Sequence, residues 1–306
     1  MSRYHTVDVA VPGGDLRVGV WEPSERLGEA WDAAPAVLLI HGVTASHLSW
    51  PFVAERLPHV RVIAPDLRGR GRSNGLEGAA GLHAHARDLV AVLDALDVER
   101  VVVVGHSMGA FVALVLGDMY PERVTRVMLV DGGLPLDLPE GLSSDEVIHF
   151  VLGPTAQRLA MRFPSVDAYL DFWRAHPAFR RDWTPELEAY LAYDLVGEEP
   201  ELRPSTSFAT LEEDSIDQNT GTAIVDALAR LRHPTVLLTA ERGLLDQVPA
   251  LYAGERLPAL LAAYPDLEHR AVADVNHYTI AMSPRGADAV AAVVRAQLAA
   301  VAEPRR

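Results

Sequence analysis

The sequence predicts an α/β fold in which a mostly parallel central sheet is flanked by helices. The main evidence is a set of short apolar runs separated by helical patterns, because a strand that is apolar on both sides is typical of a parallel sheet covered on both faces. Four such runs lie in the first half of the chain, at residues 36–40, 60–64, 101–104 and 127–130. An alternation of strands and helices of this kind predicts a doubly wound sheet.

The two ends of the chain extend this pattern. Residues 6–12 and 16–23 are β-rich runs, and the Pro-Gly-Gly-Asp sequence between them predicts a hairpin. The clearest helical pattern, at 83–96, has its apolar residues on one face. The alternation resumes later with predicted strands at 235–239 and 269–272 and a closing Ala-rich helix at 286–301.

A long insertion separates the two blocks of alternation. It carries several prolines, short helical pieces and most of the aromatic residues of the chain. We therefore expect a core domain made of residues 1–132 and 231–306, with a mainly helical cap, or lid, at 133–230. The stretch 137–217 holds 17 acidic residues against 6 Arg. This charge is interpreted either as a solvated surface or as a lid whose field disfavours anionic substrates.

The composition excludes several classes of chemistry. The 306 residues contain no Cys, which removes disulfides, thiolate nucleophiles and zinc–thiolate sites. All 27 basic residues are Arg, so a lysine Schiff base and a Ser–Lys dyad are excluded as well. A net charge of −15 disfavours nucleic acid as a partner, because nucleic-acid binding depends on neutralising phosphates. The remaining chemistry relies on Ser, His, Asp, Glu, Arg and backbone groups.

Neither a secretory signal nor a membrane span is predicted. Residues 1–12 alternate polar and apolar side chains and lack an apolar core. The most apolar stretch, 101–117, is interrupted by a Gly-His-Ser-Met-Gly sequence and is shorter than a usual membrane span. We expect a cytoplasmic protein that acts on a small molecule and does not bind membranes. The sequence leaves its oligomeric state open.

The strongest motif is the Gly-x-Ser-x-Gly sequence at 105–109, directly after an apolar run and directly before a helical pattern. In this context the serine of a sharp strand-to-helix turn is a candidate nucleophile. The tight turn requires neighbours with almost no side chain, and Gly105 and Gly109 meet this requirement. The turn also directs the amide of Met108 toward the space above Ser107, at the positive end of the helix dipole.

With this motif in place, the chain resembles the α/β-hydrolase family over nearly its whole length. The Ile-His-Gly-Val sequence at 40–43 is similar to the oxyanion loop of the family, and residues 64–73 resemble the segment after its next strand. Residues 120–124 and 129–131 also resemble family sequences at the expected places, and the insertion stands where the family carries its cap. The resemblance implies the α/β-hydrolase fold and, because the nucleophile is a serine, esterase-like chemistry with no metal or cofactor.

The resemblance also implies an oxyanion hole formed by the backbone amides of Val43 and Met108, two donors that point to where a negative oxygen develops. His41 is expected to order the loop that carries Val43. Ser107 needs a general base, and His277 is the candidate because it follows the last predicted strand, where open α/β sheets place their sites. No set of His and carboxylate residues has metal-ligand spacing, so no metal site is predicted.

Other histidines are assigned less direct roles. His106 flanks the nucleophile, and its ring either packs in the core or lines the substrate pocket. His83 and His85 lie near a helix start and are expected to face the solvent. The residue before His277 is Asn276, whereas the family usually has a small residue such as Gly at this place.

The acid that orients the base is the least determined part of the site. The family often places this acid in a later loop, where the aligned position of this chain is Gly243. Asp131 is the favoured acid, because some family members have it directly after the strand that follows the nucleophile helix. Asp246 is the alternative, followed by Glu241, if the later loop bends. A dyad without an acid is also considered, and it would hold the tautomer of His277 less well.

The predicted reaction is hydrolysis of a carboxylic ester or lactone through an acyl-enzyme intermediate on Ser107. The cap is expected to determine the substrate, with most of its apolar residues in its own core and a minority, Trp173 among them, lining the pocket. These residues are Phe150, Met161, Phe163, Tyr169, Phe172, Trp173, Phe179, Trp183 and Tyr190. A small, uncharged or apolar substrate is therefore favoured. The alternatives are C–C bond (diketone) hydrolysis, amide hydrolysis or acyl transfer by the same residues, or a ligand-binding protein without catalysis.

Overall fold

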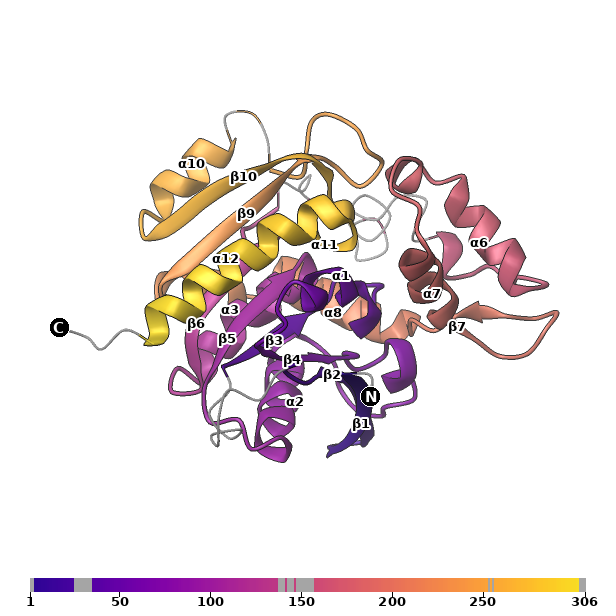
Figure 1. The fold of residues 1–306 in the computed structure, drawn as a ribbon, viewed down its shortest axis with the longest axis horizontal. Helices are drawn as coiled ribbons and strands as arrows, with labels where there is room; N and C mark the ends of the chain where they lie inside the picture. Colours follow the sequence, from indigo (N-terminus) through magenta and orange to yellow (C-terminus); the bar gives the residue numbers. More distant parts are fainter. Residues whose placement is uncertain are drawn as a thin grey trace.

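An eight-stranded sheet forms the centre of the structure, a computed structural model that describes residues 3–24, 35–136, 141, 146, 157–252, 254 and 256–302 (Figure 1). Its strands are β1 (Tyr4–Val11), β2 (Gly14–Trp21), β3 (Ala36–Ile40), β4 (Arg61–Pro65), β5 (Val101–His106), β6 (Val124–Val130), β9 (Thr235–Arg242) and β10 (Leu267–Asn276). They lie in the order β1-β2-β4-β3-β5-β6-β9-β10. The strands from β4 to β10 are parallel, while β1 and β2 form antiparallel pairs at one edge. The predicted fold with a mostly parallel sheet is confirmed.

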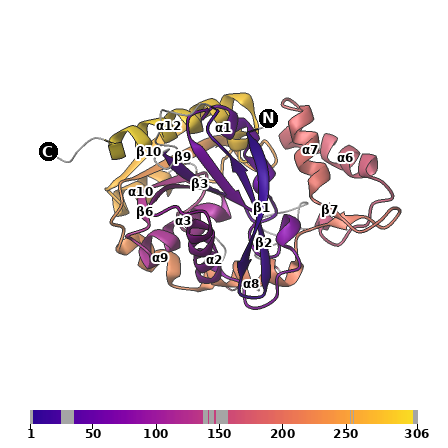
Figure 2. The same cartoon turned by 60° about the horizontal axis from the view of Figure 1, so that its bottom comes forward.

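Helices cover both faces of the sheet, as Figure 2 shows. One face carries α1 and α12, and the other carries α2, α3 and α9. Alternate residues of each strand supply the two cores: Val102 and Val104 of β5 belong to the first, and Val101 and Val103 to the second. The helices of the core are α1 (Pro51–Glu55), α2 (Leu82–Ala95), α3 (Met108–Met119), α9 (Ala223–Ala229), α10 (Arg256–Ala263), α11 (Thr279–Met282) and α12 (Pro284–Ala302).

The elements predicted from the sequence lie close to the observed ones. β1 and β2 form the predicted hairpin, with Val11 opposite Gly14. The helices predicted at 83–96 and 286–301 correspond to α2 and α12. The strands β9 and β10 run further toward their carboxyl ends than predicted. Beyond the apolar runs that indicated them, their pairing shifts in register between Val272 and Asn276 and resumes with Asn276 opposite Arg242.

The described residues from 157 to 204 form a layer beside the sheet, at the right of Figure 1. Its elements are α6 (Val166–Arg174), η4 (Pro177–Phe179), α7 (Pro185–Tyr193), β7 (Leu195–Val196) and β8 (Arg203–Pro204). The predicted cap residues that are buried there are Phe163, Tyr169, Trp173, Phe179 and Tyr190. Phe172 and Trp183 pack against them, Met161 is exposed, and Phe150 lies outside the described residues. The boundaries of the cap stay a prediction.

The helix α8 (Phe208–Thr220) lies apart from α6 and α7, and its acidic residues bind the N-terminus of α2. Three successive amides, at residues 80–82, donate to the carboxylates of Glu213, Asp214 and Asp217 at 2.7 Å each. The first amides of a helix lack helical partners, and carboxylates stabilise them. Part of the acidic charge of residues 137–217 therefore attaches α8 to the core.

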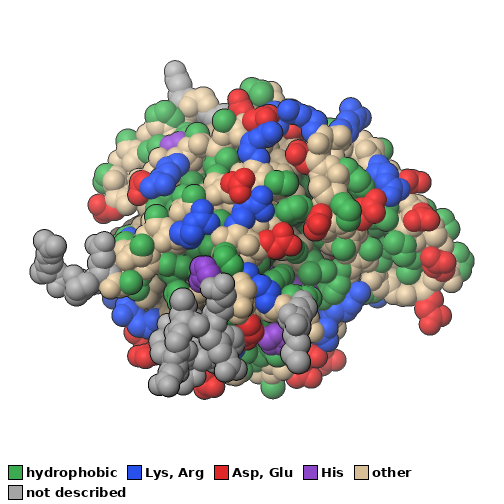
Figure 3. All heavy atoms as spheres, in the orientation of Figure 1, with side chains coloured by type: hydrophobic (Ala, Val, Ile, Leu, Met, Phe, Trp, Pro, Cys, Tyr) green, Lys and Arg blue, Asp and Glu red, His purple; other side chains and the backbone are tan. Residues whose placement is uncertain are grey.

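Most of the other described acidic residues of this stretch are exposed, whereas Asp194 is buried and pairs with Arg158. Figure 3 shows acidic and Arg side chains mixed on one face, with acidic side chains along the outer edge of the cap. None of the helices that the structure describes combines the length and the apolar composition of a membrane span.

Candidate active site

The predicted nucleophile lies at the sharp turn between β5 and α3, at the carboxyl ends of the parallel strands. Ser107 has φ 54° and ψ −121°, a strained conformation for a residue with a side chain. A Cβ on Gly105 would lie 2.0 Å from the carbonyl oxygen of Gly109, and a Cβ on Gly109 would lie 2.2 Å from that of Ile40. Both positions therefore require glycine, as the motif predicts.

Ser107 is hydrogen-bonded to a His–Asp pair. The Nε2 atom of His277 lies 3.0 Å from the Oγ of Ser107, and its Nδ1 atom lies 2.7 Å from Oδ2 of Asp131. A proton on Nδ1 is donated to the carboxylate, which leaves the lone pair of Nε2 to accept the hydroxyl proton of the serine. The geometry therefore allows His277 to take a proton from Ser107.

Asp131 is held in place by the sheet. It directly follows β6 with φ 46°, and its amide donates to the carbonyl of Leu238 at 2.7 Å. The amide of Ala240 donates to its Oδ1 at 3.0 Å, and the side chain is fully buried. One carboxylate oxygen thus binds the backbone and the other binds His277. This arrangement fixes the orientation of the carboxylate toward the imidazole.

The two alternative acids are engaged elsewhere. Oδ1 of Asp246 accepts hydrogen bonds from Nε of Arg242 at 2.7 Å and from Nδ2 of Asn276 at 3.0 Å. Although burial acts in the opposite direction, these two donors hold the pKa of Asp246 below its usual value. Glu241 is exposed and accepts the amide of Asp274 at 2.6 Å. The structure thus brings Asp131 to His277 and places Asp246 and Glu241 in a separate cluster.

The two predicted oxyanion-hole residues line the cavity at Ser107. In the described part of the chain, the amides of Val43 and Met108 have no hydrogen-bond acceptor. The peptide that carries the amide of Val43 is oriented by His41, whose Nδ1 donates to the carbonyl of Gly42 at 2.7 Å, while its Nε2 accepts the amide of Leu67 at 2.9 Å. Burial lowers the pKa of His41 to about 4, so the ring is neutral and makes both bonds. His41 orders this loop.

A buried ion pair connects the loop that carries Val43 to α8. Nε of Arg70 donates to the carbonyl of Val43 at 2.8 Å, and its Nη1 lies 2.5 Å from Oδ2 of Asp214. The other oxygen of Asp214 lies 2.9 Å from Nε2 of His85. Although burial acts in the opposite direction, Arg70 and His85 hold the pKa of Asp214 well below its usual value. Sequence reasoning missed this cluster, because its members are distant in the chain and no local pattern connects them.

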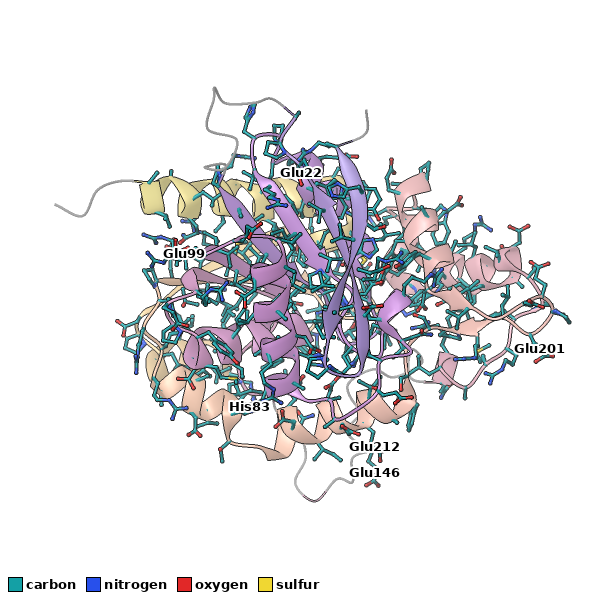
Figure 4. The ribbon with its side chains drawn as sticks, turned by 90° about the horizontal axis from the view of Figure 1, so that it is seen from below. Glu22, His83, Glu99, Glu146, Glu201 and Glu212 are labelled. Atoms are coloured by element: carbon teal, nitrogen blue, oxygen red, sulfur yellow. The ribbon has the colours of Figure 1, made fainter. Side chains whose placement is uncertain are left out.

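The prediction that His85 faces the solvent is therefore wrong. Its side chain is fully buried beneath α8, where Asp214 supplies the polar partner that a buried imidazole needs. His83, two residues earlier on the same helix, is exposed as expected and is labelled in Figure 4.

Neither of the two residues expected in the pocket, His106 and Trp173, belongs to the described walls of the cavity. His106 is buried behind His277: its Nε2 donates to the carbonyl of His277 at 2.7 Å, and the two ring centroids lie 4.9 Å apart. Trp173 is buried in the cap against Tyr169 and Phe179. Its large apolar ring is used in the core of the cap and also meets the ring of Tyr278 at a centroid distance of 6.5 Å.

The cavity at Ser107 has an apolar part and a polar part. Besides Val43 and Met108, its apolar residues are Phe111, Leu136, Leu211, Leu244 and Leu251. The polar side chains contributed by α8 are Asp214, Ser215, Gln218 and Asn219. Among the described residues, no group of three or more His, Asp or Glu side chains is arranged to hold a metal ion.

Comparison with known proteins gives matches in sequence and in structure. A sequence profile described as the α/β-hydrolase fold matches residues 35–278. Lipase LipV of Mycobacterium tuberculosis is 41% identical over 101 residues, which cover 33% of this chain and 38% of the lipase. The 2-hydroxy-6-oxo-2,4-heptadienoate hydrolase of Pseudomonas putida is 33% identical over 118 residues, which cover 37% of this chain and 43% of that enzyme. The chain therefore spans less than half the length of these curated relatives.

A solved structure matches over nearly the whole chain. A thermophilic esterase from Thermogutta terrifontis superposes with a TM-score of 0.66 at 22% sequence identity, covering 98% of this chain and 100% of the esterase. At this low sequence identity the match supports the fold alone. The fold that it supports is the one predicted from the sequence.

Proposed function

Because the chain belongs to the α/β-hydrolase fold family, we propose that it is a serine hydrolase that cleaves a carboxylic ester or lactone of a small, uncharged or apolar substrate. The observation that carries this proposal is the continuous hydrogen-bonded series from Ser107 through His277 to Asp131, at 3.0 Å and 2.7 Å. This is the arrangement that activates a serine hydroxyl for attack on an acyl carbon.

In the first half of the reaction, the Oγ of Ser107 forms a bond to the acyl carbon while its proton passes to Nε2 of His277. The carbonyl oxygen becomes negative and is stabilised by the free amides of Val43 and Met108. The C–O bond to the leaving group then breaks, and His277 returns the proton to the departing alcohol. Asp131 holds the imidazole in the required tautomer and stabilises its charged form.

In the second half, water replaces the alcohol. His277 accepts a proton from the water as its oxygen bonds to the acyl carbon, and it gives this proton back to Ser107 when the acyl-enzyme bond breaks. The carboxylic acid leaves, and the free enzyme is restored.

The cavity supports an uncharged or apolar substrate. Its apolar part includes the side chains of Phe111, Leu136, Leu211, Leu244 and Leu251, which are suited to an alkyl or aryl group. A serine hydrolase with such a cavity is expected to act on short-chain esters.

The proposal is tested by steady-state hydrolysis of p-nitrophenyl butyrate with the wild-type enzyme, Ser107→Ala and Ser24→Ala. Ser24 is an exposed serine that donates to the carbonyl of Pro58, so it controls for the loss of a hydroxyl elsewhere. We expect Ser107→Ala to lower kcat by a factor on the order of 10³ or more and Ser24→Ala to leave it unchanged. Equal rates for wild type and Ser107→Ala on every ester tried would contradict the proposal.

A second candidate is cleavage of a C–C bond in a diketone, favoured by the relative named 2-hydroxy-6-oxo-2,4-heptadienoate hydrolase. The same serine and histidine can serve this reaction, as they can amide hydrolysis or acyl transfer. Product analysis with a 1,5-diketone separates this candidate from the first, because two carbon fragments appear only if the C–C bond is broken.

A further inference from the structure

One face of α8 forms a wall of the cavity that contains Ser107. Its cavity-lining residues are Leu211, Asp214, Ser215, Gln218 and Asn219, which recur at the spacing of a single helix face. The wall is apolar at Leu211 and polar from Asp214 onward. The substrate therefore meets a polar surface on α8 as well as the apolar residues of the core.

The polar residues of this wall differ in whether they already have partners. Asp214 is occupied by Arg70 and His85. Nδ2 of Asn219 donates to the carbonyl of Ser215 at 2.8 Å and to its Oγ at 3.3 Å, and the hydroxyl proton of Ser215 has no acceptor among the residues that the structure describes. The side-chain amide of Gln218 lies on a partly exposed residue, and it makes no hydrogen bond with any residue that the structure describes. Gln218 and Ser215 are thus neutral groups with unused hydrogen-bonding capacity.

The charges of the cavity disfavour an anion. Asp131 and Asp214 both line it, and its described lining residues include no Arg. The guanidinium of Arg70, behind the wall, is fully buried and already binds the carbonyl of Val43 and the carboxylate of Asp214. A carboxylate that entered this cavity would lose its hydration without gaining a cation, whereas a neutral polar group would not incur this cost.

We propose that the cavity selects substrates that carry an uncharged hydrogen-bonding group, such as a carboxamide, which pairs with Gln218 and Ser215, and that it discriminates against a carboxylate at the same position. A carboxamide both donates and accepts, as does the side chain of Gln218. This inference rests on the proposed function, since it concerns the substrate on which Ser107 acts.

The test uses the ethyl esters of succinamic, glutaramic and adipamic acid, which place a carboxamide at three distances from the ester. Each is compared with the ethyl ester of the corresponding free acid, which differs by one charge, and with the ethyl alkanoate of the same length, which lacks the polar group. Acid release in a pH-stat gives kcat/KM. We expect the carboxamide to exceed both comparison esters about 10-fold at one length at least. A carboxylate or an alkanoate that is hydrolysed as fast as the carboxamide at every length overturns the inference.

Two variants of α8 identify the residue responsible. Glu212 lies on the same helix, does not belong to the described cavity wall, and is labelled in Figure 4. We expect Gln218→Leu to lower kcat/KM for the preferred carboxamide about 10-fold and for the alkanoate less than about 2-fold, because one hydrogen bond is lost from the first substrate only. Glu212→Leu, which also places a Leu on α8 but outside the described cavity wall, leaves both values unchanged. An equal loss on both substrates with Gln218→Leu overturns the inference.

A binding measurement separates failure of this inference from failure of the proposed function. If the wild type hydrolyses none of these esters faster than Ser107→Ala, the proposed function fails, and the selectivity is measured by calorimetric titration of Ser107→Ala with the same ethyl esters. We expect Kd for the carboxamide to be about 10-fold lower than for the carboxylate. An equal Kd, tighter binding of the carboxylate, or binding of neither overturns the inference whatever the activity.

Discussion

His106 donates a hydrogen bond from its Nε2 atom to the backbone carbonyl of His277 at 2.7 Å, and the two ring centroids lie 4.9 Å apart. Because His106 directly precedes Ser107, this bond connects the turn of the nucleophile to the loop of the proposed base. Burial, together with the neighbouring His277, lowers the pKa of His106 to about 3. The ring of His106 therefore stays neutral and adds no positive charge beside His277.

This relationship predicts a positioning role for His106. We expect His106→Leu to lower kcat on p-nitrophenyl butyrate about 10- to 100-fold with little change in KM, because a small displacement of the base is costly to the reaction and not to binding. His106→Gln keeps a donor and is expected to retain more of kcat. Steady-state kinetics of both variants gives kcat and KM, and thermal unfolding checks that both variants are folded. An equal loss in the two variants would mean that the hydrogen bond does not position His277.

The second prediction concerns the acid. Asp131→Asn is expected to lower kcat about 10³- to 10⁴-fold, because the carboxylate that fixes the tautomer of His277 is lost. Asp246→Asn is the matched control and is expected to change kcat by less than about 10-fold, since Asp246 binds Arg242 and Asn276 instead of His277. The rates are measured with p-nitrophenyl butyrate at pH 7. If Asp246→Asn has the larger effect, Asp131 is not the acid.

The fold and the sharp turn at Ser107 could be predicted because their signals are local. The apolar strand before Gly105 and the helical pattern after Gly109 specify the turn at Ser107 without any distant contact. The alternation of apolar runs likewise predicts the parallel sheet. The position of His277 follows from the fold, because it comes directly after the last strand.

The parts of the site that could not be predicted depend on contacts between distant segments. The choice between Asp131 and Asp246 depends on which carboxylate reaches His277, and no pattern near either residue encodes that distance. Asn276, which departs from the usual small residue, donates to the carbonyl of Ala178 in the cap at 2.8 Å and to Asp246 at 3.0 Å. This bridge between cap and core requires the side-chain amide of Asn276. The sequence alone shows only that this residue differs from the small residue that is usual at its place.

The third prediction is a loss of stability at mildly acidic pH. Burial lowers the pKa of His41 to about 4 and that of His106 to about 3, whereas an unfolded histidine has a pKa of about 6.5. Between these values the unfolded chain binds more protons than the folded one, so the free energy of unfolding falls as the pH falls through this window. From pH 7 to pH 5 each residue contributes a loss of about 2 kcal/mol.

Urea unfolding at pH 7 and pH 5 measures this effect. We expect the difference between the two free energies of unfolding to be smaller by about 2 kcal/mol in His106→Gln than in the wild type, because the variant has lost one buried titrating group. His83→Gln, at an exposed position of α2, should leave the difference unchanged. The same pH dependence in His106→Gln and wild type would contradict the assignment.

The fourth prediction tests the attachment of α8 to the oxyanion loop. In Asp214→Asn, the buried guanidinium of Arg70 loses its carboxylate, and leaving one charge of a buried pair uncompensated costs about 3–5 kcal/mol. Glu213→Gln is the matched control: its carboxylate is exposed and accepts only the amide of Ala80 among the described residues, so a loss below about 1 kcal/mol is expected. Urea unfolding gives both values.

A double variant shows whether the loss comes from the uncompensated charge. When Arg70→Met and Asp214→Leu are combined, no buried charge is left without a partner, so the double variant is expected to be more stable than Asp214→Asn alone. Its kcat is nevertheless expected to fall, because the carbonyl of Val43 has lost the donor on Arg70 that fixes the oxyanion loop. If Asp214→Asn unfolds no more easily than Glu213→Gln, the ion pair does not hold α8 on the core, and the wall of the cavity is kept in place by the other contacts of α8, such as the hydrogen bonds of Glu213 and Asp217 to the N-terminus of α2.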